Sequence, residues 1–136
     1  MSSEWEERPF QELLSEKLRN GLTKPKGVRG EGVRMVNMGE LFRYDRIGTQ
    51  EMERVPLSEE ETRTSLLAAG DLLFARQSLV EAGTGRCSLV LPAPEARTFE
   101  SHLIRARPDP SVAHPEFLYY WVLSPVGFAR VRSIVT

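Results

Sequence analysis

Apolar residues near the N-terminus recur with the spacing of one face of a helix. The positions are Phe10, Leu13, Leu14 and Leu18. Pro9 suits the first turn of such a helix and Gly21 lies just past its end, so the pattern predicts a helix over residues 9–18. A loop rich in glycine and basic residues follows at residues 20–32, and residues 33–38 have the composition of a short strand.

The middle of the chain alternates between helical and extended patterns. Ser58 followed three residues later by Glu61 forms a capping box, which predicts a short helix over residues 59–69 that stops at Gly70. Gly70 and Asp71 are expected to form the next turn, because glycine permits positive φ and aspartate can bond backbone amides. Three buried strands are predicted after it, at residues 72–75, 87–91 and 101–107.

Two prolines mark helix starts near the C-terminus. Pro115 opens a predicted helix that runs through Leu123, and the Ser124-Pro125 pair restarts one that reaches the end of the chain. No repeat, low-complexity tract or linker divides the sequence. The 136 residues therefore predict a single α/β domain of the α+β kind, spanning residues 1–136, with a small twisted sheet flanked by helices.

The composition is that of an ordinary folded domain. Apolar residues make up 40% and charged residues 27% of the chain, which argues against disorder. No apolar run approaches the ~18 residues of a membrane span, and the acidic N-terminus is unlike a signal peptide. The single Cys87 cannot form an internal disulfide, so we expect a reducing, cytoplasmic location.

A net charge of −1 hides a segregation of charge along the chain. Between Lys17 and Arg46 there are eight basic and three acidic residues. The basic residues are Lys17, Arg19, Lys24, Lys26, Arg29, Arg34, Arg43 and Arg46. A local excess of this kind can attract phosphate although the whole domain is nearly neutral. A solvated face with scattered ion pairs would give the same sequence pattern.

The sequence contains no constellation that predicts catalysis or metal binding. A metal site needs several ligands that converge, whereas the chain has one cysteine and two distant histidines. His114 is interpreted as a helix cap and His102 as a packed or partly exposed strand residue. Cys87 lies in an apolar strand without an acid–base partner beside it, so we expect an inert buried thiol. The glycine-rich residues 83–86 lack the Lys-Ser/Thr ending of a phosphate-binding loop and read as a tight turn formed with Gly85.

One predicted buried strand ends in three polar side chains, Arg76, Gln77 and Ser78. Arginine matches the acceptor pair of guanine, glutamine can form two hydrogen bonds with adenine, and serine can donate or accept. The segment therefore has the residue types that read base edges, while the basic loop has those that hold the phosphate backbone. The same side chains could instead bond neighbouring backbone groups or carboxylates, and the residues alone leave both interpretations open.

Sequence motifs in a fixed order connect the chain with a known family. LRNGL is followed by LLAAGDLLFARQSL and GTGRCSLV, and then by FESHLIRARPD and FLYYWVLSPVG. In this order, and over nearly the whole chain, the motifs resemble a target recognition domain of the specificity subunit of type I restriction-modification enzymes. The resemblance implies a module that binds double-stranded DNA and reads one half of a bipartite target.

The resemblance also implies that the chain is not itself an enzyme. In that family the methyltransferase (modification) subunits and the restriction subunit supply the chemistry. S-adenosylmethionine, ATP and magnesium would therefore belong to those partners, and no cofactor is expected here. The chain has no stretch long enough for the conserved spacer helix and no second recognition domain, so we expect an excised or truncated half of such a subunit.

Basic and polar residues near the predicted turns are the candidate DNA contacts. They are Lys24, Lys26, Arg29, Arg34, Asn37, Arg43, Arg76, Gln77, Ser78 and Arg86. Residues of the glycine-rich loop are expected to hold phosphates, and those after residue 75 to read base edges or adjacent phosphates. The direction of Arg46 stays open, and Arg105 and Arg107 near Asp109 are explained equally well as structural ion pairs.

Two other functions are considered. A protein-interaction module of the same fold would dock its loops on a partner protein and not read DNA. A self-cleaving repressor-type or signal-type serine peptidase is disfavoured, because it needs a lysine base near its serine and no lysine follows Lys26. Salt-sensitive, sequence-selective DNA binding would distinguish DNA recognition from protein docking, and mutation of Ser78 with an assay of proteolysis would test the peptidase.

Overall fold

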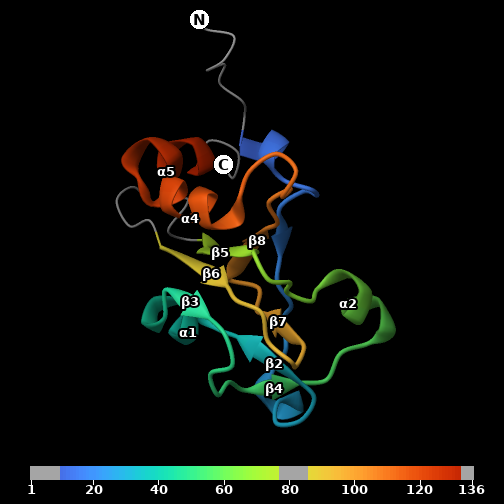
Figure 1. The fold of residues 1–136 in the computed structure, drawn as a ribbon. Helices are drawn as coiled ribbons and strands as arrows, with labels where there is room; N and C mark the ends of the chain where they lie inside the picture. The colour runs from blue at the N-terminus through green and yellow to red at the C-terminus, as the bar shows by residue number, and fades with distance from the viewer. Residues whose placement is uncertain (1–9, 77–85, 133–136) are drawn as a thin grey trace, which may run out of the picture.

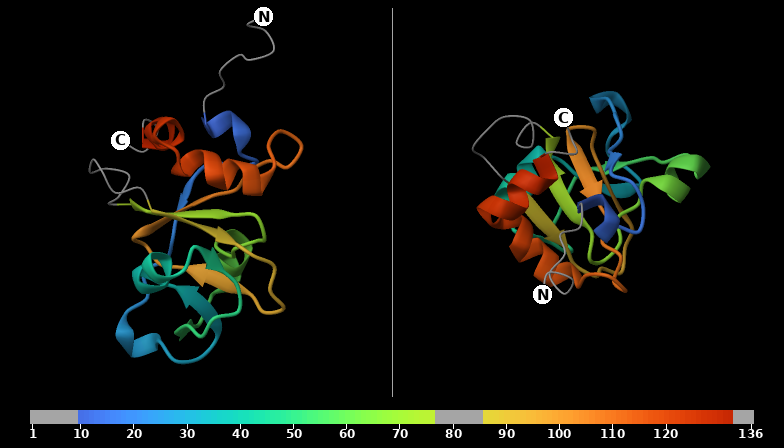
Figure 2. Two further views of the ribbon diagram at one scale, coloured as in Figure 1. Left: turned by 60° about the vertical axis from the view of Figure 1, so that its left-hand side comes forward. Right: turned by 90° about the horizontal axis from the view of Figure 1, so that it is seen from above.

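The fold is known from a computed structural model, which describes residues 10–76 and 86–132 (Figure 1). Helices α4 (Pro115–Leu123) and α5 (Pro125–Arg132) cover one face of a five-stranded sheet. A three-stranded sheet and helix α1 (Met38–Arg43) lie on its opposite side (Figure 2). This mixture of strands and helices confirms the predicted α+β class.

The larger sheet has the strand order β1-β8-β5-β6-β3. Its strands are β1 (Arg19–Asn20), β3 (Arg46–Ile47), β5 (Leu72–Ala75), β6 (Cys87–Val90) and β8 (Leu103–Ala106). β5 pairs antiparallel with β6 and β8, and all four of its residues are buried. Because β5 is covered on both faces, its sequence is an unbroken apolar run and does not alternate with polar residues.

The smaller sheet has the strand order β4-β2-β7. Its strands are β2 (Val33–Val36), β4 (Arg54–Val55) and β7 (Arg97–Phe99). β2 pairs parallel with β7 and antiparallel with β4. The sequence did not predict β3, β4 or β7, because two or three residues carry too little periodicity to distinguish a strand from a loop.

Two apolar cores lie on opposite faces of the larger sheet. Leu72 and Phe74 of β5 belong to the core that contains residues of α4, whereas Leu73 and Ala75 belong to the core that contains residues of α1 and the smaller sheet. Side chains alternate along a strand, which explains this division. Cys87 lies in the first core, buried as predicted, and burial raises the pKa of its thiol.

Most predicted strands and both C-terminal helices are confirmed. β5, β6 and β8 lie where strands were predicted, with β8 shorter than residues 101–107. α4 and α5 begin at the two prolines, and His114 caps α4 because its Nδ1 accepts a hydrogen bond from the backbone N–H of Glu116 at 3.2 Å. The strand predicted at residues 33–38 ends early, because Asn37 starts α1.

The predicted N-terminal helix is wrong beyond its first turn. Only a short 3-10 helix, Phe10–Leu13, forms there. Leu14 makes an isolated bridge to Pro108, and the next backbone N–H donates to the carbonyl oxygen of Arg107 at 2.8 Å. Because the backbone pairs with a distant segment at this point, it cannot continue the hydrogen-bond pattern of a helix.

Helix α2 (Glu59–Thr64) begins at the predicted capping box but ends before the predicted residue. The Ser58 hydroxyl accepts from the backbone N–H of Glu61 at 3.1 Å, and the Glu61 carboxylate accepts from the backbone N–H of Ser58 at 2.9 Å. Past the helix, the backbone N–H of Leu67 donates to the carbonyl oxygen of Arg97 at 2.8 Å. A longer helix would need this N–H for a bond to the carbonyl oxygen four residues before it, so the extension to residue 69 is wrong.

Candidate nucleic-acid interface

β5 brings Arg76 to one end of the larger sheet. The backbone N–H of Arg76 donates to the carbonyl oxygen of His102 at 2.8 Å, so pairing with the β8 segment fixes its backbone. The Arg76 side chain is exposed, whereas the four residues before it are buried. Gln77, Ser78 and Gly85 lie outside the described residues. A guanidinium on a fixed backbone is well placed to offer hydrogen-bond donors to a ligand.

The Gly-Asp turn before β5 sets the start of the strand. Gly70 has a φ of +95°, which favours glycine, and its N–H donates to the carbonyl oxygen of Val90 at 2.8 Å. The buried Asp71 carboxylate accepts from the backbone N–H of Ala68 at 2.7 Å and from two nitrogens of Arg107 at 2.8 and 2.9 Å. Both residues therefore serve the turn as predicted.

Arg105 and Arg107 have structural roles. Arg105 is 1% exposed, donates to backbone carbonyl oxygens and pairs with the carboxylate of Glu16. Burial lowers the pKa of Arg105, whereas hydrogen bonds to Asp71 raise the pKa of Arg107. Of the two interpretations that the sequence left open, structural ion pairs are confirmed for both arginines. Their acidic partners are Glu16 and Asp71, whereas Asp109 bonds a neighbouring serine.

Several basic residues of the glycine-rich loop are held by acidic partners. The Nζ of Lys24 lies 2.9 Å from the carboxylate of Glu61, and this hydrogen bond lowers the pKa of Glu61. Arg29 donates to the carboxylate of Glu53 at 2.5 Å and to the side-chain oxygen of Asn37 at 2.9 Å. These contacts fix the loop on its neighbours, and they occupy three of the candidate DNA-binding residues with bonds inside the protein.

Two further candidates, Arg34 and Arg86, are also occupied. Arg34 donates to the carbonyl oxygen of Thr49 at 3.2 Å and lies 3.9 Å from the carboxylate of Glu95. Arg86 donates to two backbone carbonyl oxygens in the last turn of α1, at 2.9 and 3.1 Å, and to the carboxylate of Asp45 at 2.9 Å. Arg86 therefore closes the C-terminal end of α1, where free carbonyl groups favour a positive charge.

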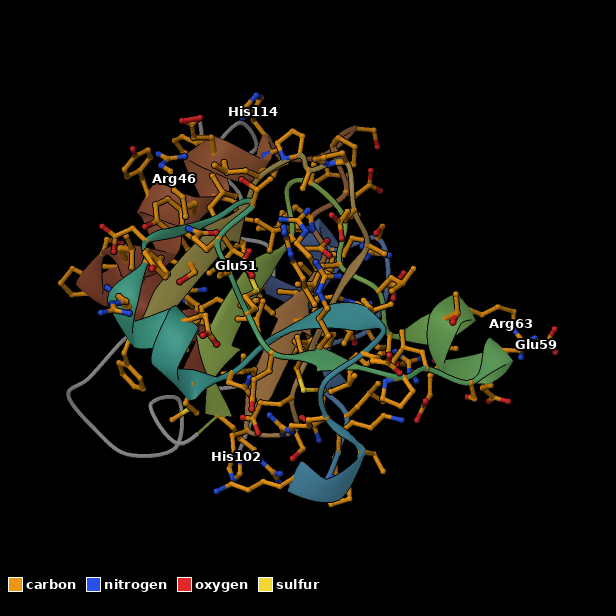
Figure 3. The ribbon with its side chains drawn as sticks, turned by 90° about the horizontal axis from the view of Figure 1, so that it is seen from below. Arg46, Glu51, Glu59, Arg63, His102 and His114 are labelled. Atoms are coloured by element: carbon orange, nitrogen blue, oxygen red, sulfur yellow. The ribbon has the colours of Figure 1, made fainter. Side chains whose placement is uncertain are left out.

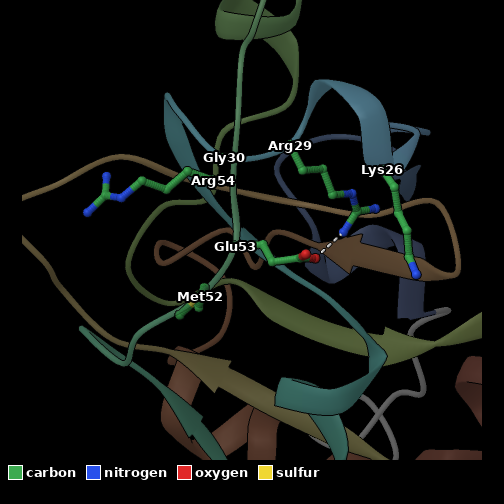
Figure 4. A pocket seen from close by; sticks show the side chains of 6 residues that line it. All are labelled: Lys26, Arg29, Gly30, Met52, Glu53 and Arg54. Atoms are coloured by element: carbon green, nitrogen blue, oxygen red, sulfur yellow. Dashed lines mark hydrogen bonds and ion pairs between the residues drawn. The ribbon is translucent and has the colours of Figure 1, made fainter.

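Lys26 lies on a short 3-10 helix, η3 (Lys26–Val28), and lines a cavity of about 420 Å³ (Figure 4). The other lining residues are Arg29, Gly30, Met52, Glu53 and Arg54. In Figure 4 the ion pair of Arg29 and Glu53 spans the space beside Lys26, and Arg54 points away from it. Lys26 itself is exposed.

Three candidate cations remain exposed and have no ion pair within the described part of the chain. They are Lys26, Arg43 and Arg76, which we call the basic edge. Arg43 ends α1, and its guanidinium lies 6.0 Å from the centre of the Tyr44 ring. Figure 2 shows the end of β5, α1 and η3 along one side of the molecule. The three exposed residues of the basic edge thus belong to three separate elements whose backbones lie on that side.

Arg46 does not belong to the basic edge, because it turns toward α4. Its guanidinium donates to the hydroxyl of Tyr120 at 2.8 Å and lies 3.5 Å from the carboxylate of Glu116. It also lies 5.6 Å from the centre of the Tyr119 ring, a distance at which a cation interacts with an aromatic face. The sequence left the direction of the Arg46 side chain open, and the structure shows that it points toward the C-terminal helices.

The sequence reasoning missed His102 as a site residue. Its side chain is 74% exposed, and its Nδ1 lies 2.8 Å from the carboxylate of Glu100. The backbone hydrogen bond to Arg76 places it beside the basic edge. A signal was present in the motif FESH, because an acid two positions before a histidine in a tight turn can bond its ring.

The exposed side chains of the basic edge are positively charged hydrogen-bond donors, which suit an anionic ligand. Across residues 10–76 and 86–132, no three His, Cys, Asp or Glu side chains group in a way that could hold a metal ion. Of the helices described there, none has the length and apolar character needed to cross a membrane.

No family model and no curated protein matches the sequence of this chain. Nine solved chains match its fold, among them the two that follow. One, from work on complex assembly and conformational transition of the type I R-M system, aligns with a TM-score of 0.56 and 19% identity over 85% of this chain and 26% of the other. The other, the HsdS subunit from Thermoanaerobacter tengcongensis, aligns with a TM-score of 0.55 and 16% identity over 92% of this chain and 27% of the other.

The chain thus spans about a quarter of the length of the solved chains that it matches. Its likeness to them extends over most of its own residues. At such low identity the likeness concerns the fold. The chain has the fold of a target recognition domain of the HsdS specificity subunits of type I restriction-modification systems.

Proposed function

We propose that this chain binds double-stranded DNA sequence-specifically, as one target recognition domain of a type I specificity subunit. It would read one half of a bipartite target on behalf of partner methyltransferase and restriction subunits. Residues 1–136 would form this one domain, and catalysis, S-adenosylmethionine, ATP and magnesium would belong to the partners. The shared fold with specificity subunits supports this role.

The observation that carries the proposal is the position of Arg76. Arg76 follows the four buried residues of β5, and its side chain is exposed. A hydrogen bond to the neighbouring segment fixes its backbone. An exposed arginine that follows a rigid strand is suited to the bidentate contact with guanine O6 and N7. Most other candidate arginines are bonded within the protein, so Arg76 is the strongest candidate for base reading.

The rest of the basic edge has a different role in this proposal. Lys26 carries a compact ammonium group on a short 3-10 helix, and Arg43 ends a short helix. Neither follows a buried central strand, so each is better suited to phosphate than to a specific base edge. Phosphate contacts would position the domain and make binding sensitive to salt, while Arg76 would distinguish sequences.

The test is a selection of bound sequences from a random duplex pool, followed by affinity measurements on the enriched duplex and on a mixed-sequence duplex. Arg76→Ala is expected to weaken binding to the enriched duplex by about 1–3 kcal/mol and to affect the mixed duplex much less. Arg76→Lys keeps the charge but lacks the guanidinium fork, so it should lose selectivity while retaining non-specific binding.

Arg63→Ala is the matched control. Arg63 is an exposed arginine on α2, and among the described residues it has one ion pair, a 3.6 Å contact to Glu60. α2 projects away from the basic edge (Figure 3). It should leave both affinities unchanged. Equal losses on the two duplexes with Arg76→Ala would identify a phosphate contact and refute base reading by this residue.

A second candidate function, docking on a partner protein without DNA reading, rests on apolar side chains exposed on the C-terminal helices. They are Phe117, Tyr120, Leu123 and Val126, with exposed fractions from 45% to 68%. Such a group of side chains is typical of protein contacts. If the folded chain enriches no duplex at low salt, while Phe117→Ser abolishes capture by the type I partner subunits, the docking function is favoured.

A further inference from the structure

His102 and Glu100 form an exposed pair in the turn between β7 and β8. The Nδ1 of His102 lies 2.8 and 3.1 Å from the two carboxylate oxygens of Glu100, and the His102 backbone N–H donates to the same carboxylate at 3.0 Å. The His102 side chain is 74% exposed, whereas that of Glu100 is 10% exposed. A nearly buried acid thus holds a ring that is open to solvent.

Backbone contacts fix Glu100 in this position. Its N–H donates to the carbonyl oxygen of Val36 at 3.0 Å, and its own carbonyl oxygen accepts from the N–H of Leu103 at 3.0 Å. Gly21 packs so closely that a Cβ there would lie 2.2 Å from the carbonyl oxygen of Glu100. Three neighbouring segments therefore hold the acid, and through it the orientation of the His102 ring.

The carboxylate determines which ring nitrogen is free. An ionised carboxylate can only accept, so the Nδ1 of His102 must donate to Glu100 and the Nε2 is left for another partner. In the neutral ring this Nε2 is an acceptor, and the phosphate oxygens and the N7 and O6 of guanine, which are also acceptors, repel it. In the imidazolium it is a charged donor, which both attract. The pair therefore couples protonation to the kind of group that the ring can bind.

The position of His102 relates this pair to the proposed DNA-binding surface. Its carbonyl oxygen accepts from the backbone N–H of Arg76, so the two side chains emerge from adjacent segments at the same end of the sheet. Figure 3 shows His102 and the other histidine, His114, on opposite sides of the molecule. Glu100 in the same turn is bonded to the His102 ring, and the backbone of Arg76 lies on the adjacent segment at the end of β5.

We propose that His102 is a proton-dependent DNA contact beside Arg76. Its imidazolium donates from Nε2 to an acceptor on DNA, either a phosphate oxygen or the N7 or O6 of guanine. Glu100 is a positioning residue, which holds the ring through Nδ1 and leaves Nε2 for the DNA. The inference rests on the proposed function, because it names a second contact and a pH dependence for the same surface.

The experiment measures the affinity of the full chain for the selected duplex and for a mixed-sequence duplex, at fixed low salt, from about pH 8 to about pH 6. Binding by the unmodified chain should tighten as the pH falls. His102→Ala should weaken it about three- to tenfold at the acidic end, the worth of one hydrogen bond at a solvent-exposed site, and have little effect at the alkaline end. Equal weakening on both duplexes identifies phosphate, and weakening on the selected duplex alone identifies guanine.

Two variants separate this contact from general effects on the fold. Glu100→Gln is nearly isosteric and should flatten the pH profile, because an amide can donate to Nδ1 as well as accept from it, so the neutral ring can also present an N–H at Nε2. His114→Ala removes a histidine from the other side of the molecule and should keep the original profile. If His102→Ala also keeps the original profile, the proposed role of His102 is overturned while DNA binding stands. If the unmodified chain binds no duplex at any pH, both proposals are overturned.

Discussion

Asp71→Ala is expected to destabilise the fold by about 3 kcal/mol. The Asp71 carboxylate is buried and accepts one hydrogen bond from the N–H of Ala68 and two from Arg107. Removing one member of a buried ion pair costs about 3–5 kcal/mol, because the other charge is left without its partner. The side chain of Arg107 is 27% exposed, and its guanidinium also lies 3.4 Å from the carboxylate of Glu16. Water and this second acid therefore bring the expected loss to the lower end of that range.

Urea unfolding followed by intrinsic fluorescence measures this loss. Trp121 stacks on Phe10, with ring centres 6.4 Å apart, so its environment reports on the packing of the C-terminal helices. For a slope of about 1.5 kcal/mol per molar urea, a loss of about 3 kcal/mol lowers the midpoint by about 2 M. Glu51→Gln, at an exposed acid, is the control and should leave the midpoint unchanged (Figure 3).

A double variant shows whether the ion pair causes the loss. Asp71→Ala combined with Arg107→Ala should be less destabilising than the sum of the two single changes, because the second change removes the charge that the first leaves unpaired. A loss below about 1 kcal/mol for Asp71→Ala, or full additivity in the double variant, would refute the reasoning. The Gly-Asp turn would then be stabilised by backbone geometry alone.

Four further predictions concern single residues. Lys26→Ala should lower the slope of log binding constant against log salt concentration by about one unit. Lys24→Ala removes a lysine already paired inside the protein and should change this slope less. Binding titrations at several salt concentrations compare the two variants. Folding lowers the pKa of Glu61, so the ionised carboxylate stabilises the fold fully above its ordinary pKa of about 4.3. This stabilisation is lost as the pH falls through the lower pKa of the folded state. The melting temperatures of Glu61→Gln and of the unmodified chain should therefore converge only in acid. Cys87 should react with a thiol reagent only when urea unfolds the chain, since burial raises its pKa; rapid labelling without urea would contradict this. Gly21→Ala should lower the unfolding free energy by about 2 kcal/mol, because its Cβ would lie 2.2 Å from a backbone oxygen.

Elements whose signals are local were predictable from the sequence. The capping box of Ser58 and Glu61 starts α2, because the bonds that it needs lie within four consecutive residues. Pro115 starts α4 because its ring fixes φ in the range of a first helical turn, and the unbroken apolar run of residues 72–75 indicates the buried strand β5. The motifs in their order also indicated the fold that the solved structures confirm.

Elements that depend on distant partners could not be predicted. The apolar spacing after Phe10 is that of a helix, yet the chain leaves the helix at Leu14 to bridge to Pro108. α2 stops early because the backbone N–H of Leu67 donates to the carbonyl oxygen of Arg97 in β7 and not to a carbonyl of the helix. In both places a tertiary hydrogen bond outweighs a local preference worth only a few tenths of a kcal/mol per residue.

The sequence by itself determined the types of residue at the candidate site, and the tertiary structure decided which of them are available. Lys24, Arg29 and Arg86 are bonded to acids that lie 37, 24 and 41 positions away along the chain. Arg76 remains exposed at the end of its strand, and His102 is oriented beside it by Glu100. An ion pair needs its two charges within about 4 Å, a condition set by folding and not by sequence separation.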